Sequence, residues 1–275
     1  MDSRSSSAID TLLSLSSVAV IAHRGGSKLQ PENTLAAFDH AASLGVAGFE
    51  CDVHVSSDGE VVVIHDPTLE RTTDATGPVG ARTAAELAAV DAGFRFAADR
   101  GFPARGQGMG VPRLAELLDR HPTMPIVVEM KGDDPRLASR TVAVVREANA
   151  GARVVLAGFS GAVLREARRL APGIPSSASM DEVRAAVMRA HFWLRPKPDG
   201  YRVFQVPMRL RGRNVLTAGF VRAARAAAVP VHAWVIDEPT DMHRLVDWGV
   251  TGLISDRPDL ALSLHKASPG VDLRD

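Results

Sequence analysis

The sequence predicts an α/β fold: a (β/α)8 barrel of the TIM type, with a β-hairpin and a small insertion after its second strand. Short apolar runs alternate with amphipathic helical patterns along the whole chain, which is typical of a parallel sheet. There are eight such runs, and 275 residues suit one barrel domain. A doubly wound open sheet is the alternative, but the turn after the first strand, HRGGSKLQPENT, does not match the G-x-G-x-x-G expected there.

The predicted strands are short and separated by helices. They are 18–22, 47–52, 125–130, 153–157, 175–179, 202–206, 230–235 and 250–254, of which 175–179 (PSSAS) has the weakest signal. The predicted helices are 33–44, 113–120, 135–148, 160–170, 180–191, 217–228, 239–248 and 257–265. In the first helix Leu35, Phe38 and Ala42 share one face, and Gly45 is placed to end it.

One region interrupts the alternation. In VHVSSDGEVVVIHD (53–66), Asp58-Gly59 lies between two alternating runs, which predicts a β-hairpin returning to His65 and Asp66. Residues 67–112 are rich in Gly, Pro, Thr and Ala, so we expect them to cross one mouth of the barrel, with a mobile loop at 94–110. The whole chain, 1–275, is interpreted as one domain with a loose N-terminus (1–15) and a hairpin and insertion at 53–112.

The composition is that of an ordinary globular protein, with a formal net charge of zero. We therefore expect no nucleic-acid partner and no polybasic membrane patch. The single cysteine, Cys51, excludes an intramolecular disulfide and a Cys-based metal site, and it fits a cytoplasmic location. Residues 9–22 are too short for a membrane span of ~20 apolar residues, and cleavage after them would remove the first strand. The oligomeric state is not predicted.

Polar residues end most of the predicted strands, and the strand ends of a (β/α)8 barrel form its site. Side chains alternate along a strand, so Glu50 and Asp52 point the same way, and so do Glu129 and Lys131. Three carboxylates at one mouth would repel one another unless a cation lies among them. Oxygen ligands suit a hard ion, so we predict one divalent cation, Mg²⁺ or Ca²⁺, held by Glu50, Asp52 and Glu129.

Two histidines, His23 and His65, are predicted to flank this ion. Their ordinary pKa of ~6.5 suits a general base and a general acid, and we favour His23 as the base, although the roles can be exchanged. Arg24 and Lys131 supply positive charge for an anionic substrate. Together these groups indicate cleavage of a phosphodiester, because one group must activate the nucleophile and another must protonate the leaving alcohol.

The motifs HRG-x(5)-PENT, E-x-D and DG-x(5)-HD, in this order, resemble the glycerophosphodiester phosphodiesterase family. The resemblance continues through RTTDATG, LAAVDAG, VPRLAELL, VVEMK, HAWVID and GVTGLISDRPD, and covers nearly the whole chain. It implies a barrel with an insertion after strand two, a divalent metal, and hydrolysis of glycerophosphodiesters to sn-glycerol 3-phosphate and an alcohol. The nucleophile would be the substrate's own glycerol hydroxyl or water. The matching positions imply His23 and His65 as the acid/base pair, Glu50, Asp52 and Glu129 as metal ligands, and Arg24 and Lys131 on the phosphate.

Phe159, Gln205 and Trp234, near later strand ends, are expected to line the substrate pocket. The chain departs from the family pattern at two places. It has Arg113 where the family usually has Thr, and Val-Ile-Asp after Trp234 where many members have Thr-Val-Asn. These departures leave the preferred headgroup open. Three alternatives remain. The first is lysophospholipase D-like hydrolysis of lysophospholipids, which a long apolar groove near 67–112 would favour. The others are a non-catalytic barrel that binds a phosphorylated ligand, and a metal-free phosphatidylinositol-type lyase, against which the three carboxylates argue.

Neighbouring polar residues are interpreted as structural. His54 is expected to support the hairpin, and Asp66 to orient its neighbours. Glu32 and Asn33 are expected to fix their loop and cap the next helix.

Overall fold

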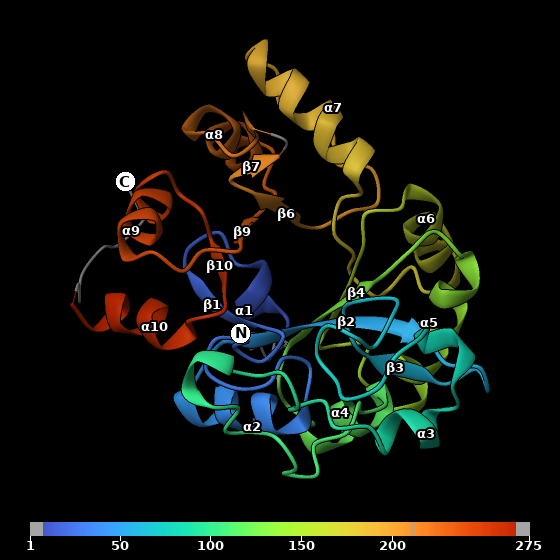
Figure 1. The fold of residues 1–275 in the computed structure, drawn as a ribbon. Coiled ribbons are helices and arrows are strands. Elements are labelled where there is room, and N and C mark those ends of the chain that lie inside the picture. Colours follow the sequence, from blue (N-terminus) through green and yellow to red (C-terminus); the bar gives the residue numbers. More distant parts are fainter. Residues whose placement is uncertain (1–7, 211, 268–275) are drawn as a thin grey trace, which may run out of the picture.

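Seven parallel strands form one curved sheet, with helices around it, in a computed structural model that describes residues 8–210 and 212–267 (Figure 1). The strand order is β5-β4-β2-β1-β10-β9-β6. These strands are β1 (Ala19–His23), β2 (Gly48–Val55), β4 (Ile126–Met130), β5 (Val154–Ala157), β6 (Phe204–Pro207), β9 (Val231–Trp234) and β10 (Gly252–Ser255). The arrangement is a TIM-like barrel, and the seven strands match seven of those predicted.

The predicted strand at 175–179 is reduced to two isolated parallel bridges. Ser176 pairs with Leu156 of β5, and Ser177 pairs with Val203 next to β6. Backbone bonds run to both sides, since Ser177 N donates to the Leu156 carbonyl and Ala178 N to the Val203 carbonyl, each at 2.9 Å. The segment therefore links the two edge strands of the sheet without being long enough for a regular strand.

All eight predicted helices are present, and each ends close to the predicted residue. They are α2 (Leu35–Leu44), α4 (Leu114–Arg120), α5 (Pro135–Glu147), α6 (Gly161–Leu170), α7 (Met180–His191), α8 (Ala218–Ala226), α9 (Pro239–Asp247) and α10 (Pro258–Ala267). Helix α2 is capped by Thr34, whose hydroxyl accepts from Ala37 N at 3.2 Å, so the cap predicted for Glu32 and Asn33 is wrong. No helix among the described residues has the length and apolar run that crossing a membrane requires.

The predicted loose N-terminus is wrong for part of its length. Residues 1–7 lie outside the described residues, but α1 (Asp10–Leu13) is a short helix whose Leu12 is fully buried. Leu12 packs with inward-facing strand residues such as Ile21 and Val127, and its carbonyl accepts a hydrogen bond from His232 Nε2 at 2.7 Å. Helix α1 therefore supplies part of the core inside the sheet.

Strand β2 extends beyond the sheet and pairs antiparallel with β3 (Val61–Val63), with a turn at Gly59 (φ 86°) between them. Beyond β3, a short 3-10 turn at Val79–Ala81, helix α3 (Ala84–Ala88) and a second 3-10 turn at Ala98–Arg100 form a small layer with its own apolar cluster. A separate ribbon of two short strands, β7 (Arg209–Leu210) and β8 (Arg213–Asn214), follows β6.

Candidate active site

The chain turns sharply at the end of β1, which places His23 and Arg24 at one mouth of the sheet. Arg24, Gly25 and Gly26 all have positive φ, at 52°, 82° and 91°. A Cβ on Gly25 would lie 2.7 Å from the Cβ of Ala37, so only glycine allows α2 to pack this closely against the turn. Helix α2 thus fixes the direction in which His23 leaves the strand.

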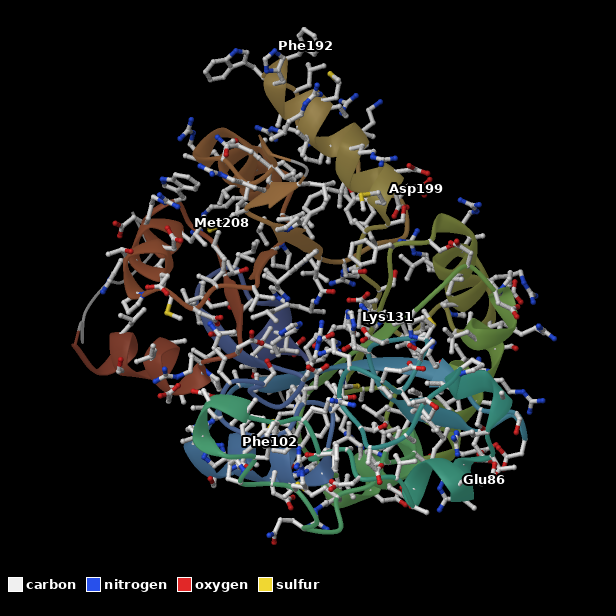
Figure 2. The ribbon with its side chains drawn as sticks, viewed as in Figure 1. Glu86, Phe102, Lys131, Phe192, Asp199 and Met208 are labelled. Atoms are coloured by element: carbon white, nitrogen blue, oxygen red, sulfur yellow. The ribbon has the colours of Figure 1, made fainter. Side chains whose placement is uncertain are left out.

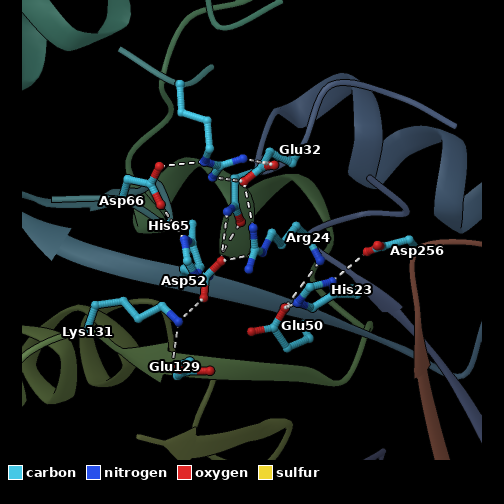
Figure 3. A network of polar contacts seen from close by, with 12 residues as sticks. His23, Arg24, Glu32, Glu50, Asp52, His65, Asp66, Glu129, Lys131 and Asp256 are labelled. Atoms are coloured by element: carbon cyan, nitrogen blue, oxygen red, sulfur yellow. Dashed lines mark hydrogen bonds and ion pairs between the residues drawn. The ribbon is translucent and has the colours of Figure 1, made fainter. Parts of the chain in front are cut away.

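Strand register brings the three predicted carboxylates together (Figure 3). Glu50 pairs with His23 across β1 and β2, and Asp52 pairs with Glu129 across β2 and β4. Glu50, Asp52 and Glu129 each offer an oxygen, and these oxygens lie within 4.8 Å of one another. Cys51, between the two acidic residues of β2, points to the opposite side and is buried in the main core, as alternation requires.

Positive groups reach two of the three carboxylates. Lys131 Nζ lies 3.0 Å from Asp52 Oδ1 and 2.7 Å from Glu129 Oε1, and Arg24 Nε lies 3.0 Å from Asp52 Oδ2. Among the described residues, the carboxylate of Glu50 accepts a hydrogen bond only from the backbone N–H of Arg24, at 3.2 Å, and His23 Nε2 lies 3.9 Å away. Glu50 is therefore the acidic group whose charge is least compensated.

The pKa values follow this unequal distribution. Burial, and then the nearby charge of Asp52, raise the pKa of Glu50 above its ordinary value. Burial also raises the pKa of Glu129, and burial together with the charge of Asp52 outweighs the lowering by Lys131. Burial acts in the same direction on Asp52, but Lys131 and Arg24 lower its pKa below the ordinary value. The shortage of positive charge in the cluster is therefore greatest next to Glu50.

Each predicted catalytic histidine is held by an aspartate through Nδ1. His23 Nδ1 lies 2.6 Å from Asp256 Oδ1, and His65 Nδ1 lies 2.6 Å from Asp66 Oδ1. Both rings line the same cavity, and Nε2 is the ring nitrogen that the aspartate leaves free in each case. The carbonyl of His65 is also bonded to His54 Nε2 at 3.0 Å, which supports the interpretation of His54 as a structural residue.

The two imidazoles differ in proton affinity. Burial lowers the pKa of His23, but the hydrogen bond to Asp256 and the charge of Glu50 outweigh burial, so the pKa is raised. Burial also lowers the pKa of His65, and there the charge of Asp52 and the bond to Asp66 do not compensate. At neutral pH, His23 thus holds a proton more firmly than His65 does.

Several residues that hold the site were missed by the sequence reasoning. Arg71 donates to both oxygens of Glu32 at 2.7 Å and, through Nε, to Asp66 at 2.5 Å, so it joins the PENT loop to the support of His65. Asn33 donates to Asp52 Oδ2 at 3.0 Å. Asp256 comes just after the predicted strand 250–254 and directly after β10, and its bond to His23 spans 233 positions in the sequence. The strand-end position was the one signal that pointed to it.

A cavity of about 1020 Å³ opens over the site. Nine of the ten predicted site residues line it, namely His23, Arg24, Glu50, His65, Glu129, Lys131, Phe159, Gln205 and Trp234. The exception is Asp52, which lies beneath the cavity floor with its side chain 1% exposed. The rings of Phe159 and Trp234 meet edge to face, 5.8 Å apart, and Gln205 Nε2 is a buried donor without a partner among the described residues.

The cavity has two different walls. The polar wall comprises His23, Arg24, Glu50, His65, Glu129 and Lys131, at the ends of β1, β2 and β4 and just beyond β3. The apolar wall comprises Val183, Val187 and Met188 of α7 together with Leu210 of β7 and Val215 after β8. No residue of segment 67–112, beside which a groove would have favoured lysophospholipids, lines this wall.

Comparisons with known proteins agree with this geometry. The sequence model of the glycerophosphoryl diester phosphodiesterase family matches residues 23–260. The chain is 30% identical to a glycerophosphodiester phosphodiesterase from Caldanaerobacter subterraneus, over 89% of this chain and 96% of the relative. It is 26% identical to a lysophospholipase D from Rattus norvegicus, over 86% of this chain and 83% of the relative. A phosphodiesterase from Oleispira antarctica, solved in complex with its product sn-glycerol-3-phosphate, superposes with a TM-score of 0.72 at 25% identity, over 90% of this chain and 96% of that one.

Proposed function

This chain belongs to the glycerophosphoryl diester phosphodiesterase family, and we propose a mechanism by which it hydrolyses glycerophosphodiesters with two histidines beside a bound cation. It is a glycerophosphodiester phosphodiesterase, which releases sn-glycerol 3-phosphate and an alcohol. The observation that carries the mechanism is the placement of His23, His65 and three converging carboxylates on one cavity.

We assign one divalent cation, Mg²⁺ or Ca²⁺, to Glu50, Asp52 and Glu129. The residues fit such an ion because all donors are hard carboxylate oxygens and because burial and the charge of Asp52, which raise the pKa of Glu50, are effects that a bound cation would offset. When bound, the ion would supply charge stabilisation to the non-bridging oxygens of the phosphate. Arg24 and Lys131 add positive charge from the same wall, and Gln205 offers an amide donor to a substrate oxygen.

The two histidines divide the proton transfers. The pKa directions support His65 as the base, since it is the ring that is neutral at neutral pH, and His23 as the acid. This is the reverse of the assignment favoured from the sequence. His65 would take the proton of the attacking hydroxyl, from water or from the substrate's glycerol, while His23 gives its proton to the departing alkoxide. Asp66 and Asp256 keep each ring oriented with Nε2 available.

We also propose two details of the fold beyond the seven-strand sheet. We propose that the whole chain is one domain in which segment 175–179 closes an eight-membered ring and residues 53–112 form an insertion after the second strand. Two contacts support the insertion's position at the site: His65 lines the cavity, and Arg71 bonds to Glu32 in the PENT loop.

The test is an assay of glycerol 3-phosphate release from a panel of glycerophosphodiesters, with and without EDTA. We expect turnover that chelation abolishes and that added Mg²⁺ or Ca²⁺ restores. Full activity in chelator would exclude the cation, and an absence of glycerol 3-phosphate from every substrate would exclude the assigned reaction.

A second candidate reaction is lysophospholipase D-like hydrolysis of lysophospholipids, and the apolar wall specifically favours it. An acyl chain requires an apolar surface next to the phosphate site, and Val183, Val187 and Leu210 provide one. A relative named lysophospholipase D also matches most of the chain. Parallel assays of glycerophosphocholine and lysophosphatidylcholine distinguish the two reactions, because a pure glycerophosphodiesterase leaves the second substrate intact. A non-catalytic barrel would be expected to lack one of these groups, and the presence of both histidines and all three carboxylates around one cavity supports catalysis instead.

A further inference from the structure

The end of α7 and the loop after it, residues 188–198, expose an unusual amount of apolar surface. We call these residues the α7 tip. Its exposed apolar side chains are Met188 (60%), Phe192 (63%), Trp193 (90%) and Leu194 (50%). Six large hydrophobic side chains are exposed in the described part of the chain, and the other two, Phe159 and Val235, line the cavity. The α7 tip is therefore a concentrated apolar patch and not part of a general scatter.

The α7 tip is held in shape by its own hydrogen bonds. Trp193 N donates to the Ala190 carbonyl at 3.0 Å, and Leu194 N donates to the Arg189 carbonyl at 2.9 Å. Arg189 Nε reaches forward to the Arg195 carbonyl at 2.8 Å. Trp193 itself has a φ of 60°, in the left-handed region that a tryptophan seldom occupies. The backbone thus presents the indole outward in a conformation that costs energy.

Positive charge surrounds this apolar patch. The sequence of the α7 tip, MRAHFWLRPKP, contains Arg189, Arg195 and Lys197 and no acidic residue. Across the cavity mouth, Arg209 and Arg213 lie on the ribbon of β7 and β8. The net charge of zero for the whole chain therefore conceals a local basic region, which the sequence totals did not reveal.

The α7 tip is continuous with the cavity over the active site. Met188, His191 and Phe192 line the cavity that also contains His23 and Glu129. Figure 2 shows Phe192 at the outer end of α7, at the edge of the molecule, and Lys131 near its centre. An amphiphilic substrate at the α7 tip would thus have an apolar path towards the polar wall.

From these observations we propose that the α7 tip inserts into an anionic lipid surface and positions the cavity mouth on it. Trp193, Phe192 and Leu194 enter the boundary between headgroups and acyl chains, where an aromatic ring and apolar side chains are favoured. Arg195 and Lys197 pair with anionic headgroups. A second copy of the chain would bury the apolar residues as well, but it would place its own basic groups against these cations. The proposal goes beyond the reaction itself, since lipid binding does not require turnover.

The test is co-sedimentation of the full chain with phosphatidylcholine vesicles, with or without phosphatidylglycerol. We expect binding to the anionic vesicles at low salt, at least ~10-fold weaker binding to pure phosphatidylcholine, and loss of binding at high salt. The fluorescence of Trp193, the most exposed apolar residue of the α7 tip, should shift to the blue when anionic vesicles are added.

Two variants separate the apolar contribution from the charge. The apolar variant is Trp193→Ser with Leu194→Ser, and the charge variant is Arg195→Glu with Lys197→Glu. We expect each of them to weaken binding to anionic vesicles by ~10-fold or more. The matched control is Arg136→Glu with Arg140→Glu on the exposed face of α5, which makes the same change in net charge and should leave most of the binding intact. Trp193→Phe should restore most of the binding lost with serine.

Turnover of water-soluble glycerophosphocholine reports on the active site without any lipid surface, so its measurement distinguishes a failure of lipid binding from a failure of the proposed function. Trp193, Leu194, Arg195 and Lys197 do not line the cavity, so these variants should retain wild-type turnover of that substrate. The proposal is overturned if the wild type ignores anionic vesicles, or if the α7 tip variants bind as well as the control. The lipid proposal is also overturned if sedimentation velocity shows a dimer of the wild type and a monomer of the variant Trp193→Ser with Leu194→Ser. The α7 tip would then bind a second copy of the chain.

Discussion

The polar wall and the apolar wall of the cavity are built from different kinds of structure. The polar wall comes mainly from strand ends, where the pairing of His23 with Glu50 and of Asp52 with Glu129 is set by the sheet. The apolar wall comes from one side of α7 and from a two-stranded ribbon outside the main sheet. The polar groups are buried or half-buried and make hydrogen bonds and ion pairs, whereas Met188 is 60% exposed.

With the proposed mechanism, this difference would assign chemistry and substrate choice to separate parts of the molecule. Proton transfer and charge stabilisation need groups fixed to a fraction of an ångström, which a sheet provides. An apolar part of a substrate needs only surface, which a helix and a ribbon at the periphery can supply and vary. Changes to the polar wall should therefore lower turnover of every substrate, and changes to the apolar wall should discriminate between substrates.

The largest effect is expected from the histidines. His23→Ala or His65→Ala should lower kcat for glycerophosphocholine by ~10²–10⁴-fold, because each removes one proton transfer. Unfolding temperature and circular dichroism should stay near those of the wild type. The control is His243→Ala, at an exposed position of α9, which should be silent. Near-normal turnover in both active-site variants would end the acid/base assignment.

A smaller effect is expected from the aspartate behind His23. Asp256→Asn keeps the shape of the side chain but removes the charge that raises the pKa of His23, so we expect kcat to fall by roughly 10–100-fold. The pH–rate profile should change as well. Because His23 must be protonated to act as the acid, a lower pKa of His23 should lower the pH at which activity is lost on the alkaline side. A fall in kcat with an unchanged pH–rate profile would show that Asp256 acts only by packing.

The apolar wall should respond differently. Val187→Asp places a charge on the α7 side of the cavity, away from the polar wall. If lysophospholipids are substrates, we expect kcat/KM for lysophosphatidylcholine to fall by ~10-fold or more, with glycerophosphocholine little affected. Val187→Leu is the matched control and should affect neither substrate strongly. Equal losses for both substrates would refute the division between the two walls.

The smallest effect concerns stability and lies outside both walls. Burial lowers the pKa of His232 to about 4, and its Nδ1 has no partner among the described residues. Between pH ~6.5 and 4, His232 is therefore protonated in the unfolded chain but not in the folded chain. The free energy of unfolding consequently decreases as the pH falls through this range. We expect the free energy of unfolding to fall by about 2 kcal/mol more between pH 7 and pH 5 than in His232→Gln. Urea denaturation at the two pH values measures it, and equal pH dependence in both proteins would contradict it.

The polar wall was largely predictable from the sequence because its information is local. Short motifs end in strand residues, and alternation alone places Glu50 and Asp52 on one side and Cys51 on the other. The bond between Asp256 and His23 was not predictable in the same way, since it depends on β10 pairing beside β1 at the far end of the chain. Even there, the strand-end position singled out the right residue without its role.

The apolar wall and the N-terminus show where such reasoning fails. The pattern of α7 predicted the helix correctly, but amphipathicity does not say that Val187 will line a cavity together with Leu210, from a ribbon with almost no strand signal. The sequence therefore did not locate the apolar wall. Likewise, nothing near Leu12 indicates that its carbonyl will accept a bond from His232, 220 residues away. Contacts of this kind depend on tertiary packing and not on local pattern.

The most direct test of the central claim is a calorimetric titration of Mg²⁺ or Ca²⁺ into chelator-treated protein. We expect binding of one ion in the wild type, loss of that binding in Glu50→Gln, and retention in Glu147→Gln at the exposed end of α5. The claim would be contradicted by unchanged binding of the ion in Glu50→Gln, or by a wild type that binds neither ion.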